Sequence, residues 1–215
     1  MQVEKAIVIG AGGHARSVLD ILLENNEYEI MGCLDPVYKE NKNIRCLGNV
    51  TVIGTDDDLE YIRTQGCKYV FVAIGNPSVR KHLYEKAISM GYMPINAISR
   101  YARISKYAKI GWGTCLMAGA VINVDCMIGN GCIINTNSSL DHDCHIEDYV
   151  HVAPGVAISG TTKIGEGTHI GTNSAVVDGI TIGEWSYIGA GAAVVGNIPA
   201  HKMAYGVPAR IIRDY

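Results

Sequence analysis

The chain has 215 residues, of which 48% are hydrophobic, and its 18 basic and 21 acidic side chains leave a formal net charge of −3. This length allows one large domain or two small ones. The negative charge and the lack of a basic run argue against a nucleic-acid-binding protein.

The N-terminal segment, the lengths of the apolar runs and the cysteines lead us to expect a soluble cytoplasmic protein. The start, MQVEKAIVIG, is too short and too soon charged for a signal peptide, and no apolar run reaches 18 residues, so no membrane span is expected. The seven cysteines are an odd number without a C-x-x-C pair. They are expected to be buried thiols in a reducing compartment.

The first part of the chain alternates apolar segments typical of strands with patterns typical of helices. Strands are expected over 6–10, 28–35 and 68–75, and helices after Gly13, over 56–65 and over 78–90. The segment 36–55 is polar and is expected to be a loop. This alternation predicts a small parallel sheet of the Rossmann type over residues 1–95, and Pro94 is a plausible breaker at its end.

A glycine-rich turn follows the first strand. Residues 10–15, GAGGHA, match the loose G-x-G-x-x-G/A pattern, and Asp35 lies about 20 residues further on, where an acid that binds ribose would lie. Three interpretations are open: a nicotinamide dehydrogenase, a nucleotide-sugar pocket, or a tight turn without a ligand. The dehydrogenase is disfavoured because the second mononucleotide half is missing. The helix N-terminus after Gly13 could bind a diphosphate.

The third strand ends in a second polar turn, Gly75-Asn76-Pro77-Ser78. Open parallel sheets bind ligands at this carboxyl edge. Arg80 and Lys81 follow as nearby cations, or simply as a solvated helix face.

An aliphatic residue recurs at every sixth position from Ile98 to Val194, seventeen times without a slip. This period predicts a β-helix in which each hexad is one short strand and one corner, and three hexads make a coil of 18 residues. Five to six coils at the strand spacing give a rod roughly 27 Å long. Glycine often follows the aliphatic residue, and we expect it there because it tolerates corner backbone angles. The rod domain is expected over 96–215.

The segment 138–155 is the most polar part of the repeat and holds His142 at a corner. Gly160 follows 18 residues later and should therefore lie about 5 Å away on the next coil. A histidine base beside a bare N–H suits acyl transfer, and Asp143 or Asp141 could hold the second ring nitrogen. The alternatives are a plain surface histidine and a metal site of several histidines: His142, His145, His151 and His169. A metal site is disfavoured because the His-x4-His spacing of rod-shaped carbonic anhydrase relatives is absent.

Five segments in their order resemble the bacterial sugar acetyltransferases of the NeuD/PglD type: VIGAGGHAR, GCLD, VAIGNPSVR, INTNSSLDHDCHIEDYVHVAPG and GVPAR. The resemblance covers the whole chain. It implies a Rossmann-like domain that binds a nucleotide-linked sugar, followed by a left-handed β-helix of hexapeptide repeats. It also implies a homotrimer with active sites between neighbouring rods, where one subunit gives the base and the next gives part of the groove for coenzyme A.

The same resemblance assigns residue roles. His142 would be the catalytic base, Asp143 would raise its basicity, and the Gly160 N–H would hold the oxyanion. The residues that would contact acetyl-CoA are His151, Thr172 and Ala190. Those of the sugar-nucleotide pocket are Gly12, Gly13, His14, Asp35, Gly75 and Ser78. Two departures from the family, Pro36 after Asp35 and the long 36–55 segment, leave the sugar and the nucleotide open.

The expected function is therefore N-acetylation of a UDP- or GDP-linked 4-amino sugar by acetyl-CoA in surface glycan biosynthesis. The amine would attack the thioester directly, because Cys144 falls in a packing position rather than at a nucleophile's place. No metal is expected. O-acetylation of sialic acid or another sugar is the alternative within enzymes, and a nucleotide-sensing scaffold is the alternative outside them.

Overall fold

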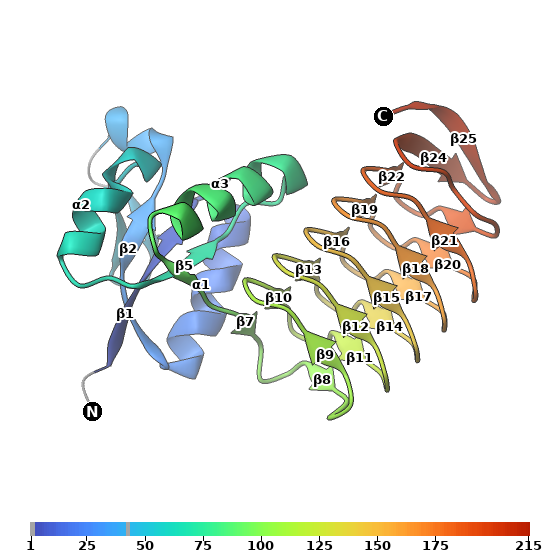
Figure 1. The fold of residues 1–215 in the computed structure, drawn as a ribbon, viewed down its shortest axis with the longest axis horizontal. Helices are drawn as coiled ribbons and strands as arrows, with labels where there is room; N and C mark the ends of the chain where they lie inside the picture. Colours follow the sequence, from blue (N-terminus) through green and yellow to red (C-terminus); the bar gives the residue numbers. More distant parts are fainter. Residues whose placement is uncertain (1–2, 42–43) are drawn as a thin grey trace. The chain divides into compact units, whose positions relative to one another are not determined.

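The computed structural model describes residues 3–41 and 44–215. The chain divides into two compact units, the first ending at Ile98 and the second running from Ser99 to Tyr215. Figure 1 shows strands and helices mixed in the first unit and short repeated strands throughout the second.

The first unit contains a six-stranded sheet in the order β3-β4-β2-β1-β5-β6. The strands are β1 (Glu4–Ile9), β2 (Tyr28–Leu34), β3 (Arg45–Leu47), β4 (Val50–Gly54), β5 (Tyr69–Val72) and β6 (Met93–Pro94). The helices are α1 (Gly13–Asn25), α2 (Leu59–Thr64) and α3 (Pro77–Ser89), with 3-10 turns at Pro36–Lys39 and Asp56–Asp58. All neighbouring strands are parallel except β3 and β4, which are antiparallel.

Local sequence explains these elements. In α1 the residues Ala15, Val18, Leu19 and Leu22 recur at helical spacing, and all four are buried. This helix ends at Asn26, which adopts the left-handed conformation that asparagine tolerates well, with φ 54°. Helix α3 begins where the Asn76 side chain accepts a hydrogen bond from a backbone amide in the first turn.

The three strands and three helices predicted for this unit are confirmed, with ends shifted by a few residues. The prediction of a loop over 36–55 is wrong, because this segment contains a 3-10 turn and the strands β3 and β4. Strand β4 forms a local antiparallel hairpin with β3 and also pairs in parallel with β2, which lies further back in the sequence. The pairing with β2 is set by tertiary structure rather than by a local pattern.

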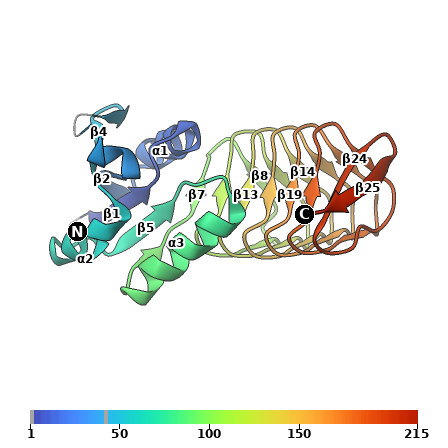
Figure 2. The same ribbon diagram turned by 90° about the horizontal axis from the view of Figure 1, so that it is seen from above.

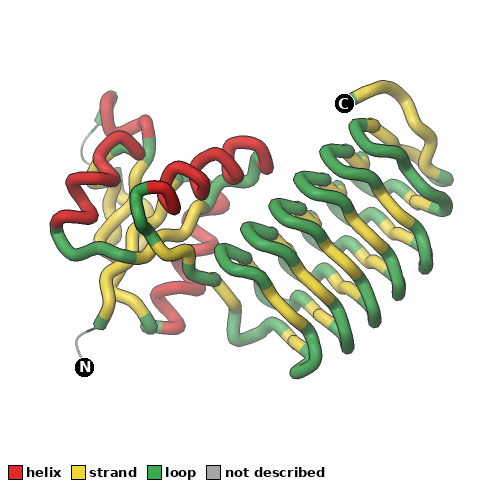
Figure 3. Tube along the Cα trace, viewed as in Figure 1, coloured by secondary structure: helices red, strands yellow, loops and turns green. Residues whose placement is uncertain are grey.

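The second unit is a parallel β-helix whose coils lie side by side (Figure 2). Short strands alternate with loops at the corners, as Figure 3 shows, and each of these strands is two residues long. After β7 (Ala97–Ile98), which ends the first unit, they are β8 (Arg103–Ile104), β9 (Lys109–Ile110), β10 (Cys115–Leu116), β11 (Val121–Ile122), β12 (Met127–Ile128), β13 (Ile133–Ile134), β14 (Ser139–Leu140), β15 (His145–Ile146), β16 (His151–Val152), β17 (Ala157–Ile158), β18 (Lys163–Ile164), β19 (His169–Ile170), β20 (Ala175–Val176), β21 (Thr181–Ile182), β22 (Tyr187–Ile188) and β23 (Ala193–Val194).

Three parallel sheets form the sides of this prism. One contains β22, β19, β16, β13 and β10, and is extended by the closing hairpin β24 (Lys202–Gly206) and β25 (Ala209–Asp214). A second contains β23, β20, β17, β14, β11 and β8, and the third contains β21, β18, β15, β12 and β9. Each strand pairs with the strand 18 residues away, as the period predicts. The second residue of each strand, from Leu116 in β10 to Val194 in β23, is buried and points to the axis of the prism.

The expected reason for the repeated glycines is wrong. Glycines such as Gly129 and Gly165 follow the inward residue but do not have left-handed backbone angles. They are required by space instead, because a Cβ on Gly165 would lie 2.4 Å from the Glu184 amide nitrogen of the next coil. Left-handed angles occur later in the corner, where many of the residues are not glycine, Asp143 and Thr161 among them.

Candidate active site

His142 lies at the corner between β14 and β15, and the local backbone directs it outward. The Asp141 carboxylate accepts a hydrogen bond from the His142 amide at 2.9 Å. Asp143 occupies the left-handed position, with φ 58°, which aspartate tolerates better than most side chains. The His142 side chain is 53% exposed, so it is accessible to a substrate.

The imidazole of His142 has a carboxylate partner. Its Nδ1 lies 2.9 Å from Asp143 Oδ2. This hydrogen bond raises the pKa of His142 above its ordinary value, and the charge of Asp141 adds to the effect. With the Nδ1 proton donated to Asp143, the Nε2 atom is left as the proton acceptor. Of the two aspartates considered from the sequence, Asp143 thus holds the ring and Asp141 holds the backbone.

The structure brings His142 and Gly160 together. A Cβ built on Gly160 would lie 2.5 Å from Cε1 and 2.7 Å from Nε2 of the imidazole, so the ring packs directly against the glycine. The Gly160 carbonyl accepts from the Gly179 amide at 3.0 Å and from the Thr161 hydroxyl at 2.7 Å. Among the described residues, none accepts a hydrogen bond from the Gly160 N–H. That N–H therefore remains available beside the ring.

The cysteines near this corner are poor nucleophiles. Cys144 is 1% exposed, and its thiol lies 3.3 Å from the Ser159 carbonyl oxygen. A hydrogen bond with Cys126 and burial both raise the pKa of Cys144, whereas the same bond lowers the pKa of the buried Cys126 thiol to about 7. The less basic thiol is enclosed, so neither is placed to attack a substrate.

The residues expected to contact acetyl-CoA lie at another corner of the same rod. Thr172 and Ala190 are exposed and stacked on consecutive coils between the sheet of β19 and the sheet of β20. His151 is half-buried on β16, and its Nε2 lies 3.3 Å from the Asn135 side-chain amide. A single chain therefore does not bring these residues to the His142 corner.

Sequence reasoning missed two features of the rod. The rings of His151, His169 and Tyr187 form a ladder with centroid separations of 4.6 and 4.9 Å. Asn123 donates a hydrogen bond to Asp141 at 3.1 Å and so supports the loop of the base. Both features could have been found from the repeat, because the residues in each contact are 18 positions apart and so lie at the same place on consecutive coils.

In the first unit, the expected sugar-nucleotide residues gather at the carboxyl edge of adjacent strands. Gly12 and Gly13 begin α1 after β1, and a Cβ on either would contact nothing within 4 Å. Gly75 and Ser78 follow β5, the neighbour of β1. Asp35 follows β2, and its carboxylate accepts from the amides of Ala11 at 2.8 Å and Val37 at 3.0 Å. It therefore braces the glycine-rich turn.

At this edge His14 is half-buried and Arg80 is buried, which the sequence did not predict. Burial, with the nearby charge of Arg80, lowers the pKa of His14 to about 4, so the imidazole is neutral at physiological pH. Its Nε2 is buried and has no hydrogen-bond partner among the described residues. Arg80 is 1% exposed and donates to the carbonyls of Ile74 and Gly75 at 2.8 and 2.9 Å. The solvated helix face considered for Arg80 is wrong.

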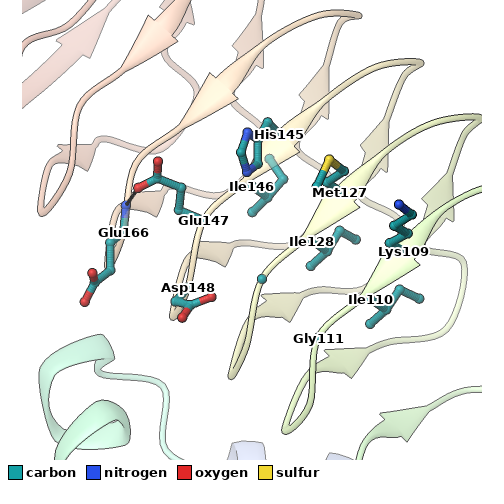
Figure 4. A pocket seen from close by; sticks show the side chains of 11 residues that line it. Lys109, Ile110, Gly111, Met127, Ile128, His145, Ile146, Glu147, Asp148 and Glu166 are labelled. Carbon is teal, nitrogen blue, oxygen red and sulfur yellow. Dashed lines mark hydrogen bonds between the residues drawn. The ribbon is translucent and has the colours of Figure 1, made fainter.

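Among the hollows of the rod, a larger one of about 500 Å³ lies over β9, β12 and β15, and none of the residues expected to act in catalysis or to bind acetyl-CoA lines it. Figure 4 shows Lys109, Met127 and His145 along successive strands, and Glu147 accepting from the Glu166 amide at 3.0 Å. The smaller, about 320 Å³, includes His142 in its wall. The other residues that line the smaller hollow are Arg103, Ser105, Ile122, Asn123, Val124 and Asp141.

No group of three or more His, Cys, Asp or Glu side chains in residues 3–41 and 44–215 is arranged to hold a metal ion. No helix in that part of the chain is both long and apolar enough to cross a membrane.

Comparison with known proteins places this geometry in a family. Residues 5–87 match the model of the PglD N-terminal domain, and residues 125–160 and 161–196 match the bacterial transferase hexapeptide model. A solved perosamine N-acetyltransferase from Caulobacter crescentus, in complex with CoA and GDP-perosamine, is 36% identical, with 99% of each chain covered and a TM-score of 0.92. The chain belongs to the hexapeptide-repeat sugar acetyltransferases.

Two other relatives of these sugar acetyltransferases agree. The acetyltransferase domain of PglB from Neisseria gonorrhoeae, in complex with acetyl coenzyme A, is 33% identical, covers 98% of this chain and 100% of that one, and has a TM-score of 0.89. The GDP-perosamine N-acetyltransferase of Escherichia coli O157:H7 is 28% identical over 73% of this chain and 71% of its own length. The expected fold, a Rossmann-like domain before a left-handed β-helix, is confirmed, and so is the class of enzyme.

Proposed function

We propose that the protein is an acetyl-CoA-dependent N-acetyltransferase of a nucleotide-linked 4-amino sugar and acts in surface glycan biosynthesis. The observation that carries this proposal is the contact between the His142 ring, held by Asp143, and Gly160 with its unused N–H. The relatives described with GDP-perosamine favour a GDP-linked acceptor over a UDP-linked one.

The reaction needs no acyl-enzyme. The sugar amine attacks the thioester carbonyl carbon while Nε2 of His142 accepts the proton that the nitrogen loses. The Gly160 N–H donates to the oxyanion of the tetrahedral intermediate. When the intermediate collapses, the C–S bond breaks, the amide remains on the sugar, and the thiolate of coenzyme A takes the proton from the imidazolium. Asp143 stabilises the charged ring between these steps.

We assign the acetyl-CoA contacts to His151, Thr172 and Ala190. Because Thr172 and Ala190 lie at a different corner from His142, the base of one subunit needs the cofactor row of a neighbouring subunit, which supports a homotrimer. The exposed small side chains Ala157 and Ala175, on the sheet between these corners, suit close packing of a second rod.

We assign the nucleotide to the carboxyl edge of the first unit. The open N-terminus of α1 at Gly12 and Gly13 suits a diphosphate, because its amides and the helix dipole attract anions. His14, Asp35, Gly75 and Ser78 surround this turn. The buried Nε2 of His14, which has no partner among the described residues, supports a polar ligand there.

We infer that the enzyme works in the cytoplasm. Its seven cysteines are all buried free thiols, and cytoplasmic glutathione keeps thiols reduced. Activated nucleotide sugars and acetyl-CoA would both be available in that compartment.

The test is release of coenzyme A thiol from acetyl-CoA with a panel of acceptors: GDP- and UDP-linked 4-amino sugars, their 4-hydroxy counterparts, and sialic acids. We expect turnover with an amino sugar and at least tenfold less with the matched hydroxy sugar. Preference for a hydroxyl acceptor would make the enzyme an O-acetyltransferase. Nucleotide binding without thiol release from any acceptor would instead support a nucleotide sensor.

A further inference from the structure

A row of small side chains inside the rod supports the corners of the next coil. These side chains occupy one position of the hexad, two residues before the inward aliphatic residue. Seven of them carry a hydroxyl or a thiol that donates to a corner carbonyl 15 residues later, over 2.8 to 3.3 Å. The pairs are Thr114 with Gly129, Cys126 with Asp141, Cys132 with Glu147, Cys144 with Ser159, Thr162 with Val177, Thr168 with Gly183 and Ser174 with Gly189.

One of these donors lies under the candidate active site. Cys144 Sγ donates to the Ser159 carbonyl at 3.3 Å. That carbonyl belongs to the same peptide group as the Gly160 N–H, which is assigned to the oxyanion. A thiol has a single proton, and a carbonyl oxygen accepts it better than the neighbouring Cys126 sulfur does. The thiol therefore contacts the peptide group that carries the oxyanion donor.

This contact determines the direction of the Gly160 N–H. The peptide group is trans, and in a planar trans group the carbonyl and the N–H point in opposite directions. Cys144 is 1% exposed, so its sulfur holds the Ser159 carbonyl from the inner side of the corner. The N–H is then directed outward, where the His142 ring packs. Among the described residues, no other group donates to the Ser159 carbonyl.

Gly160 is a residue whose neighbouring peptide groups need such a contact. Because glycine has no Cβ, rotation of the peptide group before it meets little steric resistance. The group after it is already held, since the Gly160 carbonyl accepts from the Gly179 amide at 3.0 Å and from the Thr161 hydroxyl at 2.7 Å. If the group before it turned over, the Ser159 carbonyl would replace the N–H beside the imidazole. The oxyanion would then meet an acceptor instead of a donor.

We propose that Cys144 is a positioning residue for acetyl transfer: its buried thiol holds the peptide group between Ser159 and Gly160 so that the Gly160 N–H points to the oxyanion. The proposal rests on the proposed function and gives a task to a thiol that takes no part in bond making. Cys144 acts through the peptide group, because a side chain that is 1% exposed does not reach a substrate.

The test compares two isosteric variants of the intact chain, Cys144→Thr and Cys144→Val, with acetyl-CoA and a GDP-linked 4-amino sugar. Threonine keeps a donor, as Thr162 does in the same column one coil later, 3.2 Å from the Val177 carbonyl, whereas valine has none. We expect kcat of Cys144→Val to fall about 10- to 100-fold, less than for outright removal of an oxyanion donor. Cys144→Thr should recover most of this loss. The KM values for both substrates should stay within about twofold, because the oxyanion forms only in the reaction.

Cys132→Val is the matched control. The Cys132 thiol donates to the Glu147 carbonyl at 3.1 Å at a different corner, and Val150 fills the same column one coil later. Its kcat should stay within about twofold of the unchanged enzyme, since no oxyanion donor depends on it. In Cys144→Val the acid limb of kcat/KM should stay in place, because the His142 ring keeps its hydrogen bond to Asp143.

Circular dichroism verifies that the variants are folded. If valine unfolds the chain, Cys144→Ser and Cys144→Ala make the same comparison with smaller side chains. Equal kcat values for the variants with and without a donor, an equal loss in Cys132→Val, or a shifted acid limb would each overturn the role of Cys144 and leave the proposed function intact. Failure of the unchanged enzyme to acetylate any amino sugar would instead refute the proposed function, and this inference with it.

Discussion

The rod and the α/β unit differ in how their geometry depends on sequence. In the rod, one period of six sets the strand, the inward residue and the corner, and 18 residues lead to the same place on the next coil. In the α/β unit, β4 pairs with β2 and Arg80 reaches back to the turn after β5, and no period relates these partners. A repeat therefore allows side-chain neighbours to be predicted, whereas a mixed sheet allows mainly elements to be predicted.

The difference extends to the chemistry of the two histidines that matter. His142 projects from a corner into solvent, and a neighbouring aspartate in the sequence raises its pKa. His14 is half-buried, and its pKa falls to about 4 because of burial and the charge of Arg80 on α3. The first shift has a local cause and the second a tertiary one. One ring is thus suited to accept a proton, and the other to remain neutral beside a ligand.

The largest effect should come from replacing the base itself. We expect His142→Ala to lower kcat by about 100- to 10,000-fold, the range for loss of a general base, with little effect on folding because the side chain is exposed. The measurement is thiol release at saturating substrates. His145→Ala, which removes an exposed histidine one strand later, should stay within about twofold. Similar losses in both variants would mean that His142, although it stacks against Gly160 18 residues later, has no special role in catalysis.

A second variant tests whether the position beside the His142 ring must be glycine. Gly160→Ala places a methyl group where the imidazole packs, and we expect kcat to fall about 100-fold or more as the ring and the oxyanion donor separate. The backbone of Gly160 is not left-handed, so the fold should persist, as circular dichroism can verify. Gly196→Ala is the control, because it stands at the same corner two coils later with nothing within 4 Å. Full activity of Gly160→Ala would remove Gly160 from the mechanism.

The α/β unit should be most sensitive at a contact that the sequence did not reveal. Arg80→Met leaves the carbonyls of Ile74 and Gly75 without this donor, and we expect a loss of about 2–5 kcal/mol in the free energy of unfolding. Denaturant unfolding followed by hydrogen exchange in α3 would measure it. Arg63 is an exposed arginine that donates a long hydrogen bond of 3.3 Å to the Gly91 carbonyl. Arg63→Met should therefore lower the free energy of unfolding by less than about 1 kcal/mol. Equal costs would show that Arg80 is not a tertiary anchor.

The smallest effect concerns pH. In the proposed mechanism neutral His142 is the base, so the rate should rise with pH through its pKa, which lies above the ordinary value of 6.5 because of Asp143. In Asp143→Asn that hydrogen bond to a carboxylate is lost, the pKa falls, and the acid limb of kcat/KM moves to lower pH with a reduced plateau. Asp125→Asn, at the same left-handed position one coil earlier, should leave the limb in place. An unmoved limb in Asp143→Asn would exclude His142 as the titrating group.

Much of the site's local geometry could be predicted, but its enclosure could not. The proximity of His142 and Gly160 follows from the period, and the contact of Asp143 with the ring follows from their adjacency. The hydrogen bond from the Ala11 amide to the Asp35 carboxylate and the burial of Arg80 do not follow from any spacing. They depend on which loops meet at the sheet edge, and that is decided by packing over long sequence separations.

The role of glycine in the rod shows the same limit in a repeat. The period located glycines such as Gly165 correctly, yet the reason is the approach of the next coil rather than an unusual backbone angle. Left-handed angles fall on residues such as Asp143, Tyr149 and Thr161, which no glycine pattern marks. Spacing thus indicates where a residue lies but not which steric demand it meets.

The two-part architecture, the coil register of the rod and the proximity of His142 to Gly160 follow from the sequence alone. The physical reason is that a β-helix repeats one set of backbone hydrogen bonds, so position in the chain converts directly into position in space. Only the tertiary structure decided the strand order around β4, the neutral state of His14 and the hollow beside His142. Each of these depends on burial or on side chains meeting across coils and loops, where no periodic rule relates sequence to distance.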